Sequence, residues 1–222
     1  MNVKLISYTQ PSNEMISSCI NDIQDLVSFC ARVSNPSNQY NTATNNKLLK
    51  YLISNKHWSV FEMANVCLEI ETTRDIARQI LRHRSMNFQE FSQRYSNAVD
   101  NMSFVIREAR LQDTTNRQNS INTDDEKLQK EWEEKQQQVI LAAKEAYEWA
   151  ISNGIAKEQA RVVLPEGNTM SRMYVNGTLR SWIHYCELRC GNGTQKEHMQ
   201  VARECAKVIS KIFPLIEKII PE

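Results

Sequence analysis

The sequence predicts an α+β fold: a small antiparallel or mixed sheet packed with several helices, one of them a long scaffold helix. Short segments in which apolar and polar residues alternate predict the strands, and longer segments with apolar residues three or four positions apart predict the helices. The chain has 222 residues, of which 41% are hydrophobic and 24% charged, and this is enough for one sizeable core. We therefore expect residues 1–222 to form a single domain.

The N-terminal part predicts one strand followed by one helix. Residues 3–9 alternate as a half-buried strand does, and Pro11 ends this strand. Within residues 14–32 the apolar side chains recur on one helical face, and the turn-forming residues around Pro36 end the helix.

A short helix, a second strand and another helix come next. Leucines mark a short helix over residues 48–55, and residues 65–71 alternate as a strand does. Thr72 and Asp75 have the spacing of a capping box, which predicts a helix over residues 76–81.

The central part predicts a third strand over residues 103–107 and a mobile polar surface loop over residues 110–125. Thr123 with Glu126 has the spacing of a second capping box. It opens a long amphipathic helix that ends at Gly154, and we interpret this helix as scaffold.

Three more helices are predicted towards the C-terminus. The first ends before Pro165, and the second spans about 178–189. Thr194 with Glu197 opens the third, which Pro214 interrupts.

The composition excludes several functional classes. The 27 Lys and Arg residues against 26 Asp and Glu residues give a net charge of +1, so no whole-molecule field steers the chain towards nucleic acid. Five glycines are too few and too scattered for a dinucleotide-binding turn or a P-loop. No signal peptide and no apolar run of 18 residues is present, so we expect a cytoplasmic protein without membrane or nucleic-acid partners.

The cysteines predict neither disulfides nor a metal site. Six cysteines are scattered along the chain without a C-x-x-C pair, so reduced thiols are expected. Cys186, Cys190 and His184 are close in sequence but lack a fourth ligand for a closed zinc site. We therefore expect no metal, and no catalytic thiol at either cysteine.

A group of arginines predicts an anion site. Arg74, Arg78 and Arg82 lie four positions apart and would form one cationic stripe on a helix. A solvated basic face is the alternative. No matching acid follows four positions later, and cationic and polar residues continue to Arg94, so we favour binding of an anion such as phosphate.

One motif and four flanking segments resemble the flavin-dependent thymidylate synthase family. Arg82-His83-Arg84 is followed, after seven residues, by Ser92-Gln93-Arg94-Tyr95-Ser96, which resembles the signature of that family. The flanking segments that are similar to the family's are residues 31–34, 57–62, 160–165 and 179–189.

This resemblance implies reductive methylation of dUMP to dTMP without a protein nucleophile. It implies 5,10-methylenetetrahydrofolate as carbon donor, NADPH or NADH as reductant and FAD as the redox cofactor. It also implies a homotetramer whose subunits share active sites.

The resemblance also assigns roles to individual residues. Arg189 would polarise the pyrimidine edge and favour loss of its N3 proton; Arg94 and Arg161 would bind the phosphate, and Ser92 would hydrogen-bond the substrate. The full implied dUMP set is Gln79, Arg82, Glu90, Phe91, Ser92, Gln93, Arg94, Arg161 and Arg189. The implied FAD set is Ser59, Arg82, His83, Arg84, Glu90, Thr178, Arg180 and His184.

Alternative interpretations exist for the site and for single side chains. A metal-dependent nucleotide phosphohydrolase would need clustered carboxylates, and an RNA-binding module would need aromatic residues beside the arginines. His198 lies outside the matched motif, so we expect a hydrogen-bonded core histidine. The tryptophans are expected to pack in the core; they are Trp58, Trp132, Trp149 and Trp182.

Overall fold

A four-stranded antiparallel sheet forms the centre of the fold, as the α+β prediction requires. The computed structural model describes residues 1–101 and 103–219. The sheet order is β1-β2-β6-β3. The strands are β1 (Asn2–Tyr8), β2 (Asn65–Thr73), β6 (Met170–Thr178) and β3 (Asn87–Glu90).

One face of the sheet is apolar and the other is polar. On β2, Val66, Leu68 and Ile70 are fully buried, and on β6 Met173 and Val175 are buried beside them. The alternate residues of the same strands are polar or exposed and form cross-strand pairs such as Arg172 with Glu71. The period of two along each strand therefore separates the core from solvent.

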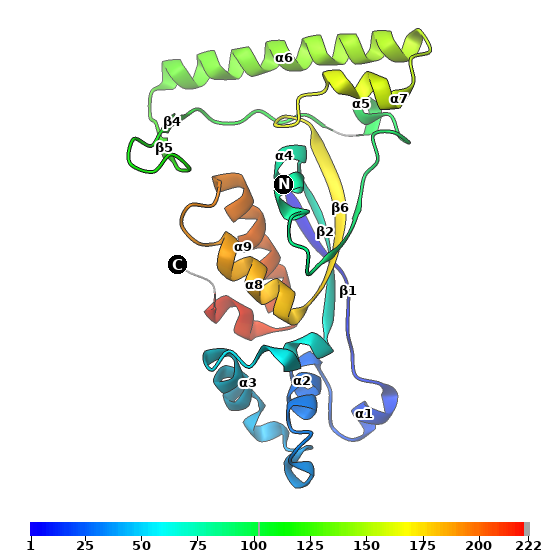
Figure 1. Ribbon diagram of the computed structural model, residues 1–222, viewed down its shortest axis with the longest axis vertical. Helices are drawn as coiled ribbons and strands as arrows, with labels where there is room; N and C mark the ends of the chain where they lie inside the picture. The colour runs from blue at the N-terminus through cyan, green and yellow to red at the C-terminus, as the bar shows by residue number, and fades with distance from the viewer. Residues whose placement is uncertain (102, 220–222) are drawn as a thin grey trace.

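Helices cover the apolar face and its ends (Figure 1). In the view of Figure 1, α8 and α9 lie on one side of the sheet, α2 and α3 lie below it, and α6 crosses the top. The helices are α1 (Asn13–Ser17), α2 (Ile23–Ala31), α3 (Asn45–Ser54), α4 (Arg74–Ile80), α5 (Ala98–Asn101), α6 (Glu126–Ser152), α7 (Lys157–Ala160), α8 (Leu179–Arg189) and α9 (Lys196–Ser210). Short 3-10 helices lie at Pro36–Asn38, Thr42–Thr44, Trp58–Met63 (η3), Arg161–Val163 (η4) and Pro214–Lys218.

The long helix α6 has its own small core. Tyr147 and Ala150 of α6 pack with Ala98, Ala160 and Leu164, which belong to α5, α7 and the segment after it. The predicted helix from Glu126 to the Asn153-Gly154 stop is confirmed. This small cluster is separate from the main core under the sheet.

Several predicted elements differ from the structure. The predicted helix over residues 14–32 is two helices, because Cys19 has a φ of 66° and Asp22 caps a new helix at Ile23. The predicted third strand over residues 103–107 is wrong, since only Phe104 forms a bridge, to Thr169. β3 and β6 were not predicted, because β3 is only four residues long and β6 contains Asn and Gly, which are rare in strands.

The predicted mobile loop contains a hairpin instead. β4 (Arg110–Gln112) pairs with β5 (Ser120–Asn122), and the side chain of Arg110 donates to Glu197 on α9. Lys196 of α9 also reaches Glu108, with its Nζ 2.6 Å from the carboxylate. These ion pairs hold the hairpin against α9.

None of the three predicted capping boxes forms. Thr73, not Thr72, is the N-cap residue of α4 and forms no side-chain cap hydrogen bond, and Asp125 caps α6 by accepting from the N–H of Leu128 at 3.0 Å. Gln195 is the N-cap residue of α9 and forms no side-chain cap hydrogen bond, and the hydroxyl of Thr194 donates to the carbonyl of Leu188 instead. Spacing alone identified the helix starts to within a few residues but not the capping atoms.

The cysteine and tryptophan predictions have different outcomes. All six cysteines are free thiols, as predicted. Trp182 is fully buried, and its indole N–H donates to the carbonyl of Val66 at 2.9 Å. Trp132 and Trp149 on α6 are 45% and 63% exposed, so the core prediction is wrong for them.

Candidate active site

His83 and Arg189 meet at the C-terminal end of α8. The Nε of Arg189 donates to Nε2 of His83 at 2.9 Å. A guanidinium can only donate, so this histidine carries its proton on Nδ1. Burial, with the positive charge of Arg189, lowers the pKa of His83 to about 4, and the ring is neutral near pH 7. Of the three guanidinium nitrogens of Arg189, only Nε has a hydrogen-bond partner among the described residues. The two terminal nitrogens therefore remain available.

The turn that carries His83 is fixed to α8. The hydroxyl of Ser181 donates to the carbonyl of Ser85 at 3.0 Å, and the side chain of Met86 packs under Gly177. Arg82 and Arg84 are exposed on this turn, and neither forms an ion pair with another described residue. The tertiary contacts thus hold the Arg-His-Arg motif with its arginines pointing outwards.

A second group of predicted residues lines a cavity of about 350 Å³, here called the Arg161 pocket. Gln93 is only 4% exposed, and its Nε2 has no partner among the described residues. A buried donor without a partner is rare and marks a place where a ligand can complete the hydrogen bonding. The lining residues are Arg74, Arg78, Gln93, Glu158, Gln159, Arg161, Val162, Leu164 and Glu166.

Ion pairs hold the arginines around this pocket. Arg78 lies 3.6 Å from Glu166, and Arg94 lies 3.3 Å from Glu158. The pocket carries three arginines and two glutamates, so an entering anion would compete with the carboxylates for the guanidinium groups.

The predicted arginine stripe is only partly correct. α4 ends at Ile80, so Arg82 lies beyond the helix and outside the pocket. Arg74 is buried and lies 3.5 Å from Glu90, which also accepts from the hydroxyl of Ser171 at 2.8 Å. Arg78 also lies 4.0 Å from this carboxylate, so three neighbours hold Glu90 at the end of β3.

A third group, here called the α8 N-terminal group, lies at the start of α8. Thr178 caps the helix, and Arg180 donates to Glu62 at 2.7 Å. The ring of His184 lies edge-on to Trp58, with 4.8 Å between the ring centroids. The predicted members of this group are Ser59, Thr178, Arg180 and His184.

The α8 N-terminal group is separate from the other two places within one chain. α8 has 11 residues, so its two ends lie roughly 15 Å apart. Glu90 is opposite Met173, five residues from Thr178 along β6, which corresponds to about 17 Å. Of the predicted dUMP and FAD residues, the Arg161 pocket is lined by Gln93 and Arg161.

The remaining predicted dUMP residues flank these groups. The backbone N–H of Phe91 donates to the carbonyl of Arg172 at 2.8 Å, and Ser92 follows it at an exposed position. Gln79, on α4, contacts Gln195 and His198. His198 is buried and hydrogen-bonded, as predicted, but the sequence analysis missed its position beside a predicted substrate residue.

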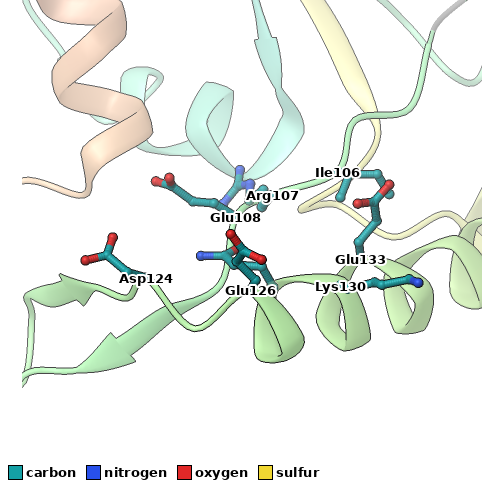
Figure 2. Close-up of a pocket in the computed structure, with 8 residues that line it drawn as sticks. Ile106, Arg107, Glu108, Asp124, Glu126, Lys130 and Glu133 are labelled. Carbon is teal, nitrogen blue, oxygen red and sulfur yellow. The ribbon is translucent and has the colours of Figure 1, made fainter.

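A larger hollow lies away from these residues. Figure 2 shows it between the segment around Arg107 and the start of α6, with carboxylates and cations around it and a volume of about 650 Å³. It contains none of the predicted site residues. The described residues also contain no group of three or more His, Cys, Asp or Glu side chains placed to hold a metal ion.

Comparisons with known proteins decide the family. The profile described as "Thymidylate synthase complementing protein" matches residues 14–215. A "Probable flavin-dependent thymidylate synthase" of Paramecium bursaria Chlorella virus 1 is 47% identical over 98% of both chains. The chain belongs to the flavin-dependent thymidylate synthase family. A second relative with the name "Flavin-dependent thymidylate synthase", from Synechocystis sp., is 45% identical over 97% of both chains.

A solved structure supports the fold of this flavin-dependent thymidylate synthase family member. The UMP/dUMP methylase PolB from Streptomyces cacaoi, bound with 5-Br UMP, superposes with a TM-score of 0.78 over 98% of this chain and 92% of that chain. Its sequence identity is 21%, so this likeness concerns the fold alone. Within residues 1–101 and 103–219, no helix is both long enough and apolar enough to cross a bilayer.

Proposed function

We propose that this chain is a flavin-dependent thymidylate synthase that converts dUMP to dTMP. In this proposal 5,10-methylenetetrahydrofolate supplies the carbon, NADPH or NADH supplies the reducing equivalents, and FAD is the cofactor. Besides the family membership, one observation carries it: the contact between His83 and Arg189, which joins two separately matched segments of the chain.

The Arg161 pocket is the proposed site for the dUMP phosphate. Arg161 and Arg78 line it, and Arg94 lies at its edge beside Glu158. Arginine forks suit phosphate oxygens, and the unpartnered Nε2 of Gln93 adds a neutral donor. The remaining proposed dUMP contacts are Gln79, Arg82, Glu90, Phe91 and Ser92.

Arg189 is the proposed catalytic residue. Its charge is permanent, and its free terminal nitrogens can face a pyrimidine carbonyl while its Nε stays with His83. A fixed positive charge stabilises the negative charge that develops on the pyrimidine when its N3 proton leaves. No protein nucleophile is needed, and Ser92 has no histidine or acid placed to activate it among its hydrogen-bond partners in the described chain.

The α8 N-terminal group fits a cofactor that carries a diphosphate. The start of an 11-residue helix, the half-exposed Arg180 and the exposed hydroxyl of Ser59 are all donors suited to phosphate oxygens. His83, Arg82, Arg84, Glu90, Thr178 and His184 would complete the surroundings of FAD. The bound cofactor supplies the hydride chemistry, and these side chains bind and orient it.

We also propose a homotetramer with shared active sites. Within one chain the start of α8 lies roughly 15 Å from its C-terminal end, where Arg189 is, and about 17 Å along β6 from the position opposite Glu90. Tyr95 and Val162, which lie beside the Arg161 pocket, are 87% and 83% exposed, and Trp149 on α6 is 63% exposed. Apolar side chains of this size usually become buried in an interface when they cluster near a site.

The experiment that tests this function uses purified full-length protein. With FAD, NADPH, methylenetetrahydrofolate and dUMP tritiated at C5, we expect tritium release and formation of dTMP, and omission of any one component should abolish dTMP formation. A preparation that takes up no flavin and forms no dTMP under these conditions would contradict the proposal. Replacing NADPH with NADH then shows which nicotinamide is used.

A further inference from the structure

His198 contacts a predicted substrate residue from the interior of the protein. It lies on α9, is fully buried, and its Nδ1 is 3.1 Å from Oε1 of Gln79 on α4. The two residues are 119 positions apart in the sequence, so only the tertiary packing of α4 on α9 brings them together. Gln79 in turn donates from Nε2 to Oε1 of Gln195 at 2.8 Å.

Glu197, Gln195, Gln79 and His198 form a series of hydrogen bonds. The direction of each bond in this series follows from Glu197, at the end opposite His198. Glu197 accepts from Arg110, and hydrogen bonds from Arg110, its own backbone and Gln195 lower its pKa against the opposing effect of burial. The ionised carboxylate can only accept, so the Nε2 of Gln195 donates to it, at 3.0 Å. The carbonyl oxygen of Gln195 must then accept from Gln79.

The same logic defines the proton on His198. Because the amide nitrogen of Gln79 donates to Gln195, its carbonyl oxygen faces His198 and requires a donor there. His198 must therefore carry its proton on Nδ1. Its Nε2 is buried without a partner among the described residues, as expected of an unprotonated nitrogen turned into the core.

The surroundings keep His198 neutral. Burial, then the charge of Arg189 and the neighbouring His83, lowers the pKa of His198 to about 3. The rings of His83 and His198 are 6.4 Å apart and almost perpendicular. The neutral form has one donor and one acceptor, and only the donor on Nδ1 has a partner in the described chain.

We infer that His198 is a positioning residue for dUMP binding, which fixes the amide of Gln79 so that its second N–H is presented to the substrate. With its oxygen held by His198 and one N–H held by Gln195, Gln79 has only one free donor. Without His198 the amide could rotate by 180° and present its oxygen instead. This inference rests on the proposed function, because the substrate is dUMP.

The test measures dUMP binding by calorimetry on the FAD-loaded protein. His198→Leu fills a similar volume without a donor, and we expect the Kd for dUMP to rise about five- to tenfold, the value of one lost neutral hydrogen bond. His198→Asn places an amide nitrogen near the position of Nδ1 and should restore the Kd to within about twofold of wild type. Val201→Ala, a buried change one turn further along α9, should lower the melting temperature without changing the Kd.

A double-mutant cycle separates positioning from packing. If His198 acts through Gln79, then His198→Leu should cause no further rise in Kd when Gln79 is already Ala. A rise that persists in the Gln79→Ala background, or an Asn variant as weak as the Leu variant, overturns the inference. Wild-type protein that binds no dUMP contradicts the proposed function, whereas wild-type binding with an unchanged His198→Leu variant contradicts only the inference.

A measurement on the unaltered protein covers the case in which His198→Leu does not fold. The chain has four histidines, so their ring nitrogens can be resolved by NMR after ¹⁵N-histidine labelling, with His198→Asn for assignment. We expect His198 and His83 to be neutral at pH 7 with the proton on Nδ1. A proton on Nε2 of His198 would reverse the amide of Gln79 and overturn the inference.

Discussion

Arg189 combines one engaged nitrogen with two terminal nitrogens that the proposed function assigns to the substrate. Its Nε is engaged with His83, while its terminal nitrogens have no partner among the described residues. A guanidinium divides its donors in this way because they lie in one plane and point in different directions. The contact with His83 therefore orients the free part of the group.

Arg189→Ala should abolish most of the methylation while the protein keeps its fold and its flavin. Loss of a preorganised positive charge at a developing negative charge typically costs about 10²–10³ in kcat, and we expect a decrease of that size in tritium release. Arg189→Lys keeps the charge but loses the fork, so we expect an intermediate rate. Full activity of the Ala variant, with a normal flavin spectrum, would remove Arg189 from the mechanism.

The two neutral histidines predict how stability depends on pH. Burial first, and then neighbouring positive charge, lowers the pKa of His83 to about 4 and of His198 to about 3. The unfolded chain therefore binds more protons than the folded chain below about pH 6.5, so stability is complete above this pH and is lost as the pH falls towards 4. Each histidine contributes up to about 1.4 kcal/mol per pH unit in that window.

Urea unfolding at pH 7, 6 and 5 measures this effect, because most carboxyl groups titrate below this range. The His198→Asn variant should lose less stability between pH 6 and pH 5 than the wild type. Equal losses for both proteins would show that His198 is not the titrating group.

At the scale of elements, the strand-to-helix turn between β6 and α8 depends on a glycine. A Cβ atom on Gly177 would lie 3.1 Å from the Cγ of Met86 and 3.4 Å from the Cβ of Ser181. The same turn holds the Arg-His-Arg segment through the hydrogen bond from Ser181 to Ser85. Close packing at Gly177 thus holds the start of α8 against the segment that carries Arg82-His83-Arg84.

Gly177→Val should destabilise the protein by about 2 kcal/mol, because overpacking forces neighbouring side chains or backbone to move. Gly167→Val is the matched control, since a Cβ atom at Gly167 meets nothing within 4 Å. The control should stay within about 0.5 kcal/mol of wild type. Chemical denaturation compares the two variants, and equal stabilities would contradict the packing argument.

The elements also show where prediction from sequence works. Helices over residues 48–55, 126–153 and 178–189 were predicted because a long amphipathic period of 3.6 is a local property of the chain. β3 was missed because four residues carry too little periodicity, and its partner β6 lies more than 80 residues away. The split at Cys19 was missed because the apolar spacing continues through a residue whose backbone turns to positive φ.

At the scale of the whole molecule, two large apolar side chains beside the Arg161 pocket are open to solvent. Tyr95 and Val162 are almost fully exposed beside a pocket lined by arginines. A partner subunit would bury these side chains and could bring its own site residues to the pocket. In this proposal, the activity therefore depends on formation of the tetramer.

Val162→Asp should weaken the tetramer and the activity together. A charge placed in a buried interface core is unfavourable by several kcal/mol unless it is paired. Light scattering should show the wild type near 103 kDa, four times the 25.8 kDa chain, and the variant at a lower mass. Ile16→Asp, at a 46% exposed position on α1, is the control and should leave mass and activity unchanged. A tetrameric, inactive Val162→Asp variant would separate assembly from activity.

The sequence by itself determined the α+β class, most of the helices, and the family, because periodicity and motif spacing are written in consecutive residues. It also predicted which arginines and histidines form the site. Only the tertiary structure decided that His83 contacts Arg189, that Gln79 contacts His198, and that the residues predicted at the start of α8 lie apart from the other predicted site residues in one chain. The physical reason is that these contacts join residues more than 100 positions apart. Their hydrogen bonds form only after α4, α8 and α9 have packed against the sheet.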